Sequence, residues 1–93
     1  MNRAHCTLPA ITAGSSAAAT VTVDAGRALT SSDTPVLDIY IDTTSNIDSY
    51  QADWANVYRA DAGYNDSGTA TNNSIRFYAN SAVTGGETIY IVY

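Results

Sequence analysis

The sequence predicts a mainly β protein: an antiparallel two-layer β-sandwich of jelly-roll type with one short helix, at about residues 47–55. Several short segments alternate apolar and polar residues with the period of a strand, most clearly 36–42 and 73–79. Gly, Asn, Asp and Ser, which favour turns, separate these segments. A chain of 93 residues makes a single domain over 1–93, and two packed layers bury the apolar faces of about six short strands.

The first half of the chain alternates between strand-like and turn-like segments. We expect three strands here, over residues 8–11, 19–24 and 36–42. A turn over 13–16 separates the first two strands, and a polar connection over 25–34 separates the last two. Pro9 restricts the first strand to a sheet edge, because proline cannot donate a ladder hydrogen bond. Val21 and Val23 share one face of the second strand. Residues 1–7 are expected to form a flexible arm.

The second half adds a helix and then returns to strands. Ser45 and Asp48 resemble a capping box at the start of the helix over 47–55. We then expect a strand over 56–60 and a polar loop over 61–73. A hairpin follows, whose two strands, 73–79 and 88–93, are joined at Gly85-Gly86.

The charge balance excludes several classes of partner. The chain has no lysine, its four cations are arginines, and eight aspartates and one glutamate give a net charge of −5. Phosphate backbones and anionic membranes bind basic faces, so we expect neither nucleic acid nor a membrane as partner. No stretch approaches the ~20 apolar residues of a membrane-spanning helix. Cys6 is the single cysteine, so no internal disulfide forms.

Catalytic constellations are weak in this sequence. A Ser-His-Asp site would have to use His5, the single histidine. Its neighbour Cys6 would point to the opposite face of a strand, which predicts a surface imidazole and a partly buried thiol. Asp38 and Asp42 lie about 13 Å apart along one strand face, too far for a pair of glycosidase carboxylates. We therefore expect no enzyme activity and no cofactor.

A metal site is also not expected. Oxygen ligands for calcium are present in the polar loop, but the same residue types form ordinary turns. The residues that keep this alternative open are Asp61, Asn65, Asp66 and Ser67.

The aromatic residues divide between core and surface. Trp54, Phe77 and Tyr50 are expected in the core. Alternation places Tyr40 and Tyr78 on the polar faces of their strands. Exposed tyrosines are enriched in protein interfaces and also stack on sugars, so at least one tyrosine is expected to bind a partner.

The arginines are scarce cations in an acidic protein. Arg59 and Arg76 would pair with Asp38 or Asp42 across strands, or with a carboxylate of a partner. Together with the tyrosines they give the candidate interface residues: Tyr40, Tyr78, Tyr90, Tyr93, Arg59 and Arg76.

The second half of the chain resembles a family of small β domains found in bacteriophage structural proteins. The resemblance covers roughly residues 20–93 and rests on the order of these segments: Ser32-Asp33-Thr34-Pro35-Val36-Leu37-Asp38-Ile39, Tyr50-Gln51-Ala52-Asp53-Trp54-Ala55-Asn56-Val57-Tyr58-Arg59-Ala60, Ser74-Ile75-Arg76-Phe77-Tyr78-Ala79 and an Ile-rich last strand. The loop 61–73 is longer than in that family, and Gly85-Gly86 stands in place of its Lys-Pro-type turn. The resemblance implies a component of a virion.

Among virion components, the small size, acidic surface and polar composition favour a capsid decoration (cement) protein on the outer capsid surface. Its expected partners are the major capsid protein and copies of itself, as a homotrimer. The arm over 1–7 would order on binding the shell. The alternative is a head fibre, tail fibre or adhesin module that recognises a host surface glycan or protein through Tyr40, Tyr78 and the loop 61–73. An enzyme is the third class, and it would depend on His5.

Overall fold

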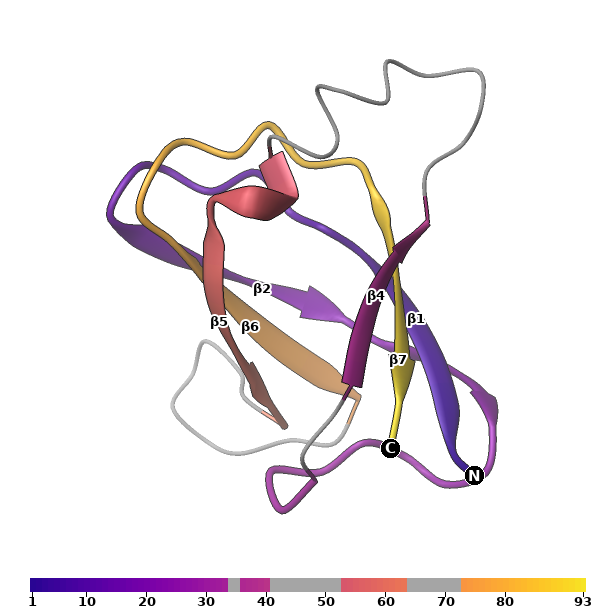
Figure 1. The fold of residues 1–93 in the computed structure, drawn as a ribbon. Helices are drawn as coiled ribbons and strands as arrows, with labels where there is room; N and C mark the ends of the chain where they lie inside the picture. Colours follow the sequence, from indigo (N-terminus) through magenta and orange to yellow (C-terminus); the bar gives the residue numbers. More distant parts are fainter. Residues whose placement is uncertain (34–35, 41–52, 64–72) are drawn as a thin grey trace.

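The computed structural model describes residues 1–33, 36–40, 53–63 and 73–93, with the segment 36–40 described by its backbone. Two antiparallel sheets pack face to face, as Figure 1 shows. Within the described residues the strands are β1 (Arg3–Thr7), β2 (Ser15–Thr20), β3 (Thr22–Ala25), β4 (Val36–Tyr40), β5 (Val57–Ala62), β6 (Ser74–Ala79) and β7 (Thr88–Val92). The prediction of a mainly β, two-layer antiparallel fold is confirmed.

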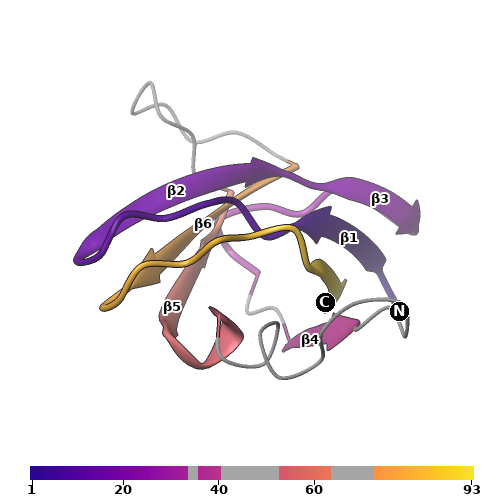
Figure 2. The same cartoon turned by 90° about the horizontal axis from the view of Figure 1, so that it is seen from above.

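Each sheet combines strands that are far apart in the sequence. One sheet has the order β3-β1-β7-β4 and the other the order β2-β6-β5. The chain passes from one sheet to the other between β2 and β3, where Val21 is buried, and Figure 2 shows these two strands following one another across the molecule. The predicted strand 19–24 is therefore two strands, although its alternation is confirmed: Val21 and Val23 are more buried than Thr20, Thr22 and Asp24.

The expectation of a flexible arm over residues 1–7 does not hold, because Arg3–Thr7 form β1. This strand pairs with β3 on one side and with β7 on the other. Its inner side chains, Ala4 and Cys6, are small and nearly inaccessible to solvent. Small inward residues allow close packing but give a faint hydrophobic pattern, which explains why the sequence did not indicate a strand.

The predicted hairpin of 73–79 and 88–93 is wrong. β6 pairs with β2 and β5, whereas β7 pairs with β1 and β4, so the two strands belong to opposite layers. The connection over 80–87 runs instead along the segment 8–11, through a bridge between Ile11 and Val83. The predicted first strand at 8–11 is thus reduced to this bridge and to neighbouring backbone hydrogen bonds.

Other predicted boundaries hold in part. The turn at 13–16 is shorter, since β2 already begins at Ser15. The strand predicted at 56–60 is β5. Residues 53–55 are helical, so the predicted helix over 47–55 ends where it was expected to end. Its predicted start lies outside the described residues. The loop prediction fails at Asp61 and Ala62, which end β5, and residues 64–72 lie outside the described part.

The core lies between the sheets and is closed by alternate side chains of β6 and β7. Ile75, Phe77, Ile89 and Ile91 have no exposed surface. Phe77 is confirmed in the core, and Trp54, from the helical segment, is partly buried and packs against it edge to face with ring centroids 6.4 Å apart. The expected third member, Tyr50, lies outside the described residues.

The connection between the layers depends on a glycine. Gly85 has φ +83, and a Cβ atom there would lie 2.7 Å from the carbonyl oxygen of Leu8. Gly86, with φ +104, has no atom within 4 Å of the place of a Cβ. Both residues have a left-handed backbone, but only at Gly85 is there also no room for a side chain.

The neighbouring glycines give a matched pair of variants. Gly86→Ala should lower the free energy of unfolding by about 1 kcal/mol, the cost of the left-handed backbone. Gly85→Ala should cost about 2 kcal/mol beyond that, because the backbone at Leu8 must also move. Urea denaturation measures both values. Equal losses for the two variants would contradict the close approach of the connection to the segment 8–11.

Candidate functional site

The outer surface of the three-stranded sheet gathers three of the predicted interface residues. Side chains alternate along β6, so Ile75, Phe77 and Ala79 are buried while Arg76 and Tyr78 face outward. Arg59 on β5 is the register partner of Tyr78. The strand register shifts between Val57 and Arg59, and the residue at this irregularity is Tyr58. We call Tyr58, Arg59 and Tyr78 the tyrosine–arginine face.

Tyr78 contacts both other side chains of the tyrosine–arginine face. The Arg59 guanidinium carbon lies 3.8 Å from the ring centroid of Tyr78, a cation–π geometry. The rings of Tyr58 and Tyr78 have centroids 6.3 Å apart. Asp61 accepts a hydrogen bond from Arg59 Nη2 at 2.9 Å and holds the guanidinium over the ring. Tyr58 is nevertheless 59% exposed and Arg59 exposed over 54% of its side chain, so the cluster presents ordered aromatic and cationic surface to solvent.

Of the two predicted partners of the arginines, Asp38 is not a neighbour of either one across a strand pair. It belongs to β4, which lies in the other sheet from β5 and β6. Arg59 pairs with Asp61 on its own strand, and Arg76 Nη1 donates to Ser16 Oγ at 2.6 Å. The second predicted partner, Asp42, lies outside the described residues.

The remaining interface candidates lie elsewhere. Tyr90 is 45% exposed on the four-stranded sheet, opposite His5 of β1. Tyr93 is partly buried, and its hydroxyl donates to the carbonyl oxygen of Arg27. Tyr40 pairs with Thr88 through the backbone, and its side chain lies outside the described residues. The six candidates therefore do not form one surface.

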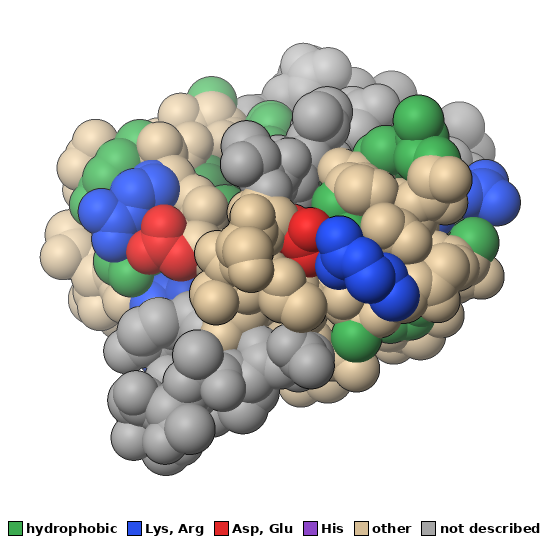
Figure 3. All heavy atoms as spheres, turned by 90° about the horizontal axis from the view of Figure 1, so that it is seen from below, with side chains coloured by type: hydrophobic (Ala, Val, Ile, Leu, Met, Phe, Trp, Pro, Cys, Tyr) green, Lys and Arg blue, Asp and Glu red, His purple; other side chains and the backbone are tan. Residues whose placement is uncertain are grey.

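Positive charge is dispersed over the part of the molecule that is described. Figure 3 shows the arginines of one face at separate places, two of them beside acidic side chains. Arg27 makes a two-pronged ion pair with Asp33 at 2.7 and 2.9 Å. This pair holds the pKa of the Asp33 carboxyl below its usual value, and Asp33 also accepts from the Thr30 N–H group.

Sequence reasoning missed a contact between His5 and Asp24. Both oxygens of Asp24 lie within 2.9 Å of His5 Nδ1, across the neighbouring strands β1 and β3. The two residues are 19 positions apart, and the connection between them depends on a strand pairing that was not predicted. A histidine and an aspartate, two of the residue types of a Ser-His-Asp site, thus meet, but among the described residues no hydroxyl bonds to His5.

The other reactive or metal-binding candidates do not gather into a site. His5 and Cys6 point to opposite faces as predicted, and burial raises the pKa of the Cys6 thiol to about 12, which disfavours the thiolate form. Asp61 pairs with Arg59, while Asn65, Asp66 and Ser67 lie outside the described residues. Residues that the structure describes contain no group of three or more His, Cys, Asp or Glu placed for a metal ion. They also contain no helix of the length and apolar character that a bilayer requires.

A buried carboxyl group stands out near the helical segment. Glu87 is 1% exposed, and neither of its carboxylate oxygens has a hydrogen-bond partner. Asp53, which accepts from the N–H groups of Thr84 and Gly85, adds a nearby negative charge. Burial, and to a smaller extent Asp53, raises the pKa of Glu87 above its usual value.

No family model, curated protein or solved structure matches this chain.

The buried carboxyl group of Glu87 should make the free energy of unfolding fall as pH rises. Its raised pKa favours the protonated form in the fold, so the stability that it contributes is fully present below about pH 4.3 and is lost as pH rises through the raised value. Glu87→Met removes this buried polar group and should raise the free energy of unfolding at pH 7 by on the order of 1 kcal/mol.

Urea denaturation from pH 4 to 8 measures this effect as the difference between the variant and the wild type. Titration of Asp33 has the opposite slope, because its lowered pKa removes stability as pH falls, and it cancels in the difference. A difference that stays constant with pH would contradict the assignment to Glu87.

Proposed function

We propose that this chain is a non-enzymatic structural protein of a bacteriophage virion, and that it acts as a capsid decoration protein on the outer surface of the shell. The major capsid protein is the proposed partner, and the tyrosine–arginine face is the proposed contact. The order of the phage-like sequence segments supports the virion assignment. The jelly-roll winding expected of the sandwich belongs to the same proposal, since the observed sheets establish only two packed antiparallel layers.

The single observation that carries the proposal is the exposed and ordered Tyr58–Arg59–Tyr78 cluster. Tyrosine and arginine dominate the binding energy of protein interfaces, because each combines a large contact area with hydrogen-bonding atoms. Here Asp61 and the Tyr78 ring already hold the Arg59 guanidinium, so less side-chain entropy is lost on binding. An exposed cluster that is ordered before binding is suited to a permanent contact.

The edge of the three-stranded sheet and the net charge fit the same role. β5 pairs with β6 alone among the described strands, so the tyrosine–arginine face lies beside a sheet edge where a second body can approach closely. A net charge of −5 favours solubility of the free protein. Three copies around an axis, the arrangement expected from the sequence, would multiply a weak contact with the shell by avidity.

A head fibre, tail fibre or adhesin module is the second candidate. The observation that favours it is the high exposure of Tyr58 beside Tyr78, because two neighbouring tyrosine rings also suit a receptor on a host surface. Binding of the isolated protein to host cells, and not to shells, would select this candidate.

Titration of the purified protein onto capsid shells that lack it tests the proposed function. We expect saturable, stoichiometric binding, measured by co-sedimentation. Tyr78→Ala and Arg59→Ala should each weaken it at least about tenfold, because both lie at the centre of the contact. Tyr90→Ala, on the opposite sheet, is the matched control and should bind as the wild type does. Absence of saturable binding, or equal loss in the control, would refute the assignment.

A further inference from the structure

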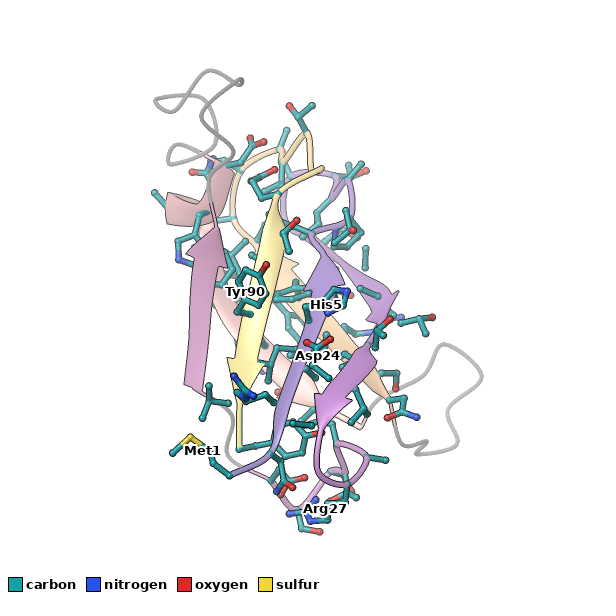
Figure 4. All side chains as sticks on the ribbon, turned by 90° about the vertical axis from the view of Figure 1, so that its right-hand side faces the viewer. Met1, His5, Asp24, Arg27 and Tyr90 are labelled. Carbon is teal, nitrogen blue, oxygen red and sulfur yellow. The ribbon has the colours of Figure 1, made fainter. Side chains whose placement is uncertain are left out.

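We infer that the outer face of the four-stranded sheet holds a second binding site, for a single sugar ring, in the hollow lined by His5, Asp24 and Tyr90. This site goes beyond the proposed attachment through the tyrosine–arginine face and does not depend on it. Figure 4 shows the three side chains on neighbouring strands of this face. The hollow has a volume of about 630 Å³, which is within the range of small-ligand sites.

Strand pairing fixes the position of each group in the hollow. His5 on β1 lies directly opposite Tyr90 on β7, and their ring centroids are 6.3 Å apart. Asp24, on β3, holds His5 from the other side through Nδ1 at 2.8 Å. An aromatic ring, an imidazole and a carboxylate therefore form one row across three adjacent strands.

The polar groups of this row remain open to a ligand. The side chains of His5 and Asp24 are 40% and 39% exposed. Nδ1 of His5 is committed to Asp24, whereas no described residue bonds to Nε2. The Asp24 carboxylate has further acceptor capacity, since each oxygen can accept more than one hydrogen bond. The His5–Asp24 pair thus offers a further hydrogen-bonding atom on each of its two side chains.

The rim of the hollow adds a cation and two hydroxyls. Arg3 precedes His5 on the same face of β1 and lines the hollow. Thr7 and Thr88, which are register partners, line its other end. Donors and acceptors therefore surround the exposed ring of Tyr90.

This combination matches the chemistry of a pyranose ring. One face of a sugar carries C–H groups with partial positive charge, which suit the electron-rich face of Tyr90. The hydroxyls at its edge are donors and acceptors, which suit the carboxylate of Asp24, the imidazole of His5 and the guanidinium of Arg3.

Other ligand classes fit the hollow less well. Asp24 and the net charge of −5 repel a phosphate group. A hydrophobic ligand would leave the carboxylate and guanidinium desolvated. A peptide that adds a strand needs a sheet edge, whereas β1 and β7 are paired on both sides.

Nuclear magnetic resonance on the full chain tests the site. The probes are the methyl glycosides of glucose, galactose, mannose and N-acetylglucosamine, each titrated to about 50 mM, because single-ring contacts typically bind in the millimolar range. We expect at least one glycoside to shift the ring signals of His5 and Tyr90 saturably. Sodium phosphate at the same concentration should leave them unchanged.

Variants separate this site from the attachment face. Tyr90→Ala and His5→Ala should weaken glycoside binding at least about tenfold, while Tyr90→Phe, which keeps the ring, should retain it. Tyr78→Ala, on the other sheet, is the matched control and should bind as the wild type does. Amide spectra establish that each variant is folded. Absence of shifts with all four glycosides, or loss in Tyr78→Ala alone, would overturn the inference, and neither result bears on shell binding.

Discussion

The alternation of side chains along β6 and β7 is the constraint on which the rest of the structure depends. Every second residue of each strand is buried in the space between the layers, as Phe77 and Ile89 illustrate. Because a strand has a period of 2, this burial also fixes what faces outward. Tyr78 appears on one outer surface and Tyr90 on the other. The positions of both proposed binding sites are therefore consequences of how the core is filled.

The two layers are held together by chain crossings as well as by packing. The chain passes from the three-stranded to the four-stranded sheet at Val21, and it makes the same crossing again along the connection over 80–87, where the N–H group of Gly86 donates to the carbonyl oxygen of Leu8. Glu87, at the end of this connection, is buried without a hydrogen-bond partner. Burying a carboxyl group without a hydrogen bond lowers the free energy of unfolding, and a domain of this size has little stability to lose. The connection over 80–87 therefore holds the layers together and also carries one destabilising residue.

Local pattern in the sequence predicts the strands better than their partners. Alternation identified β6, β7 and the outward position of Tyr78, since it depends on neighbouring residues only. It could not show that β6 and β7 lie in different sheets, because the same alternation suits a hairpin. β1 was missed since Ala4 and Cys6 are small. The contact of His5 with Asp24 followed from the pairing of β1 and β3, and Tyr58 joined its site through an irregularity in β5, neither of which a local pattern contains.

The separation of the two outer faces is the central claim, and backbone nuclear Overhauser effects test it most directly. We expect cross-strand contacts between the register partners Cys6 and Ile89 in the four-stranded sheet, and between the register partners Ala17 and Phe77 in the three-stranded sheet. We also expect no ladder of backbone contacts between β6 and β7. A ladder joining residues 74–79 to 88–92 would place Tyr78 and Tyr90 in one sheet and would contradict the account.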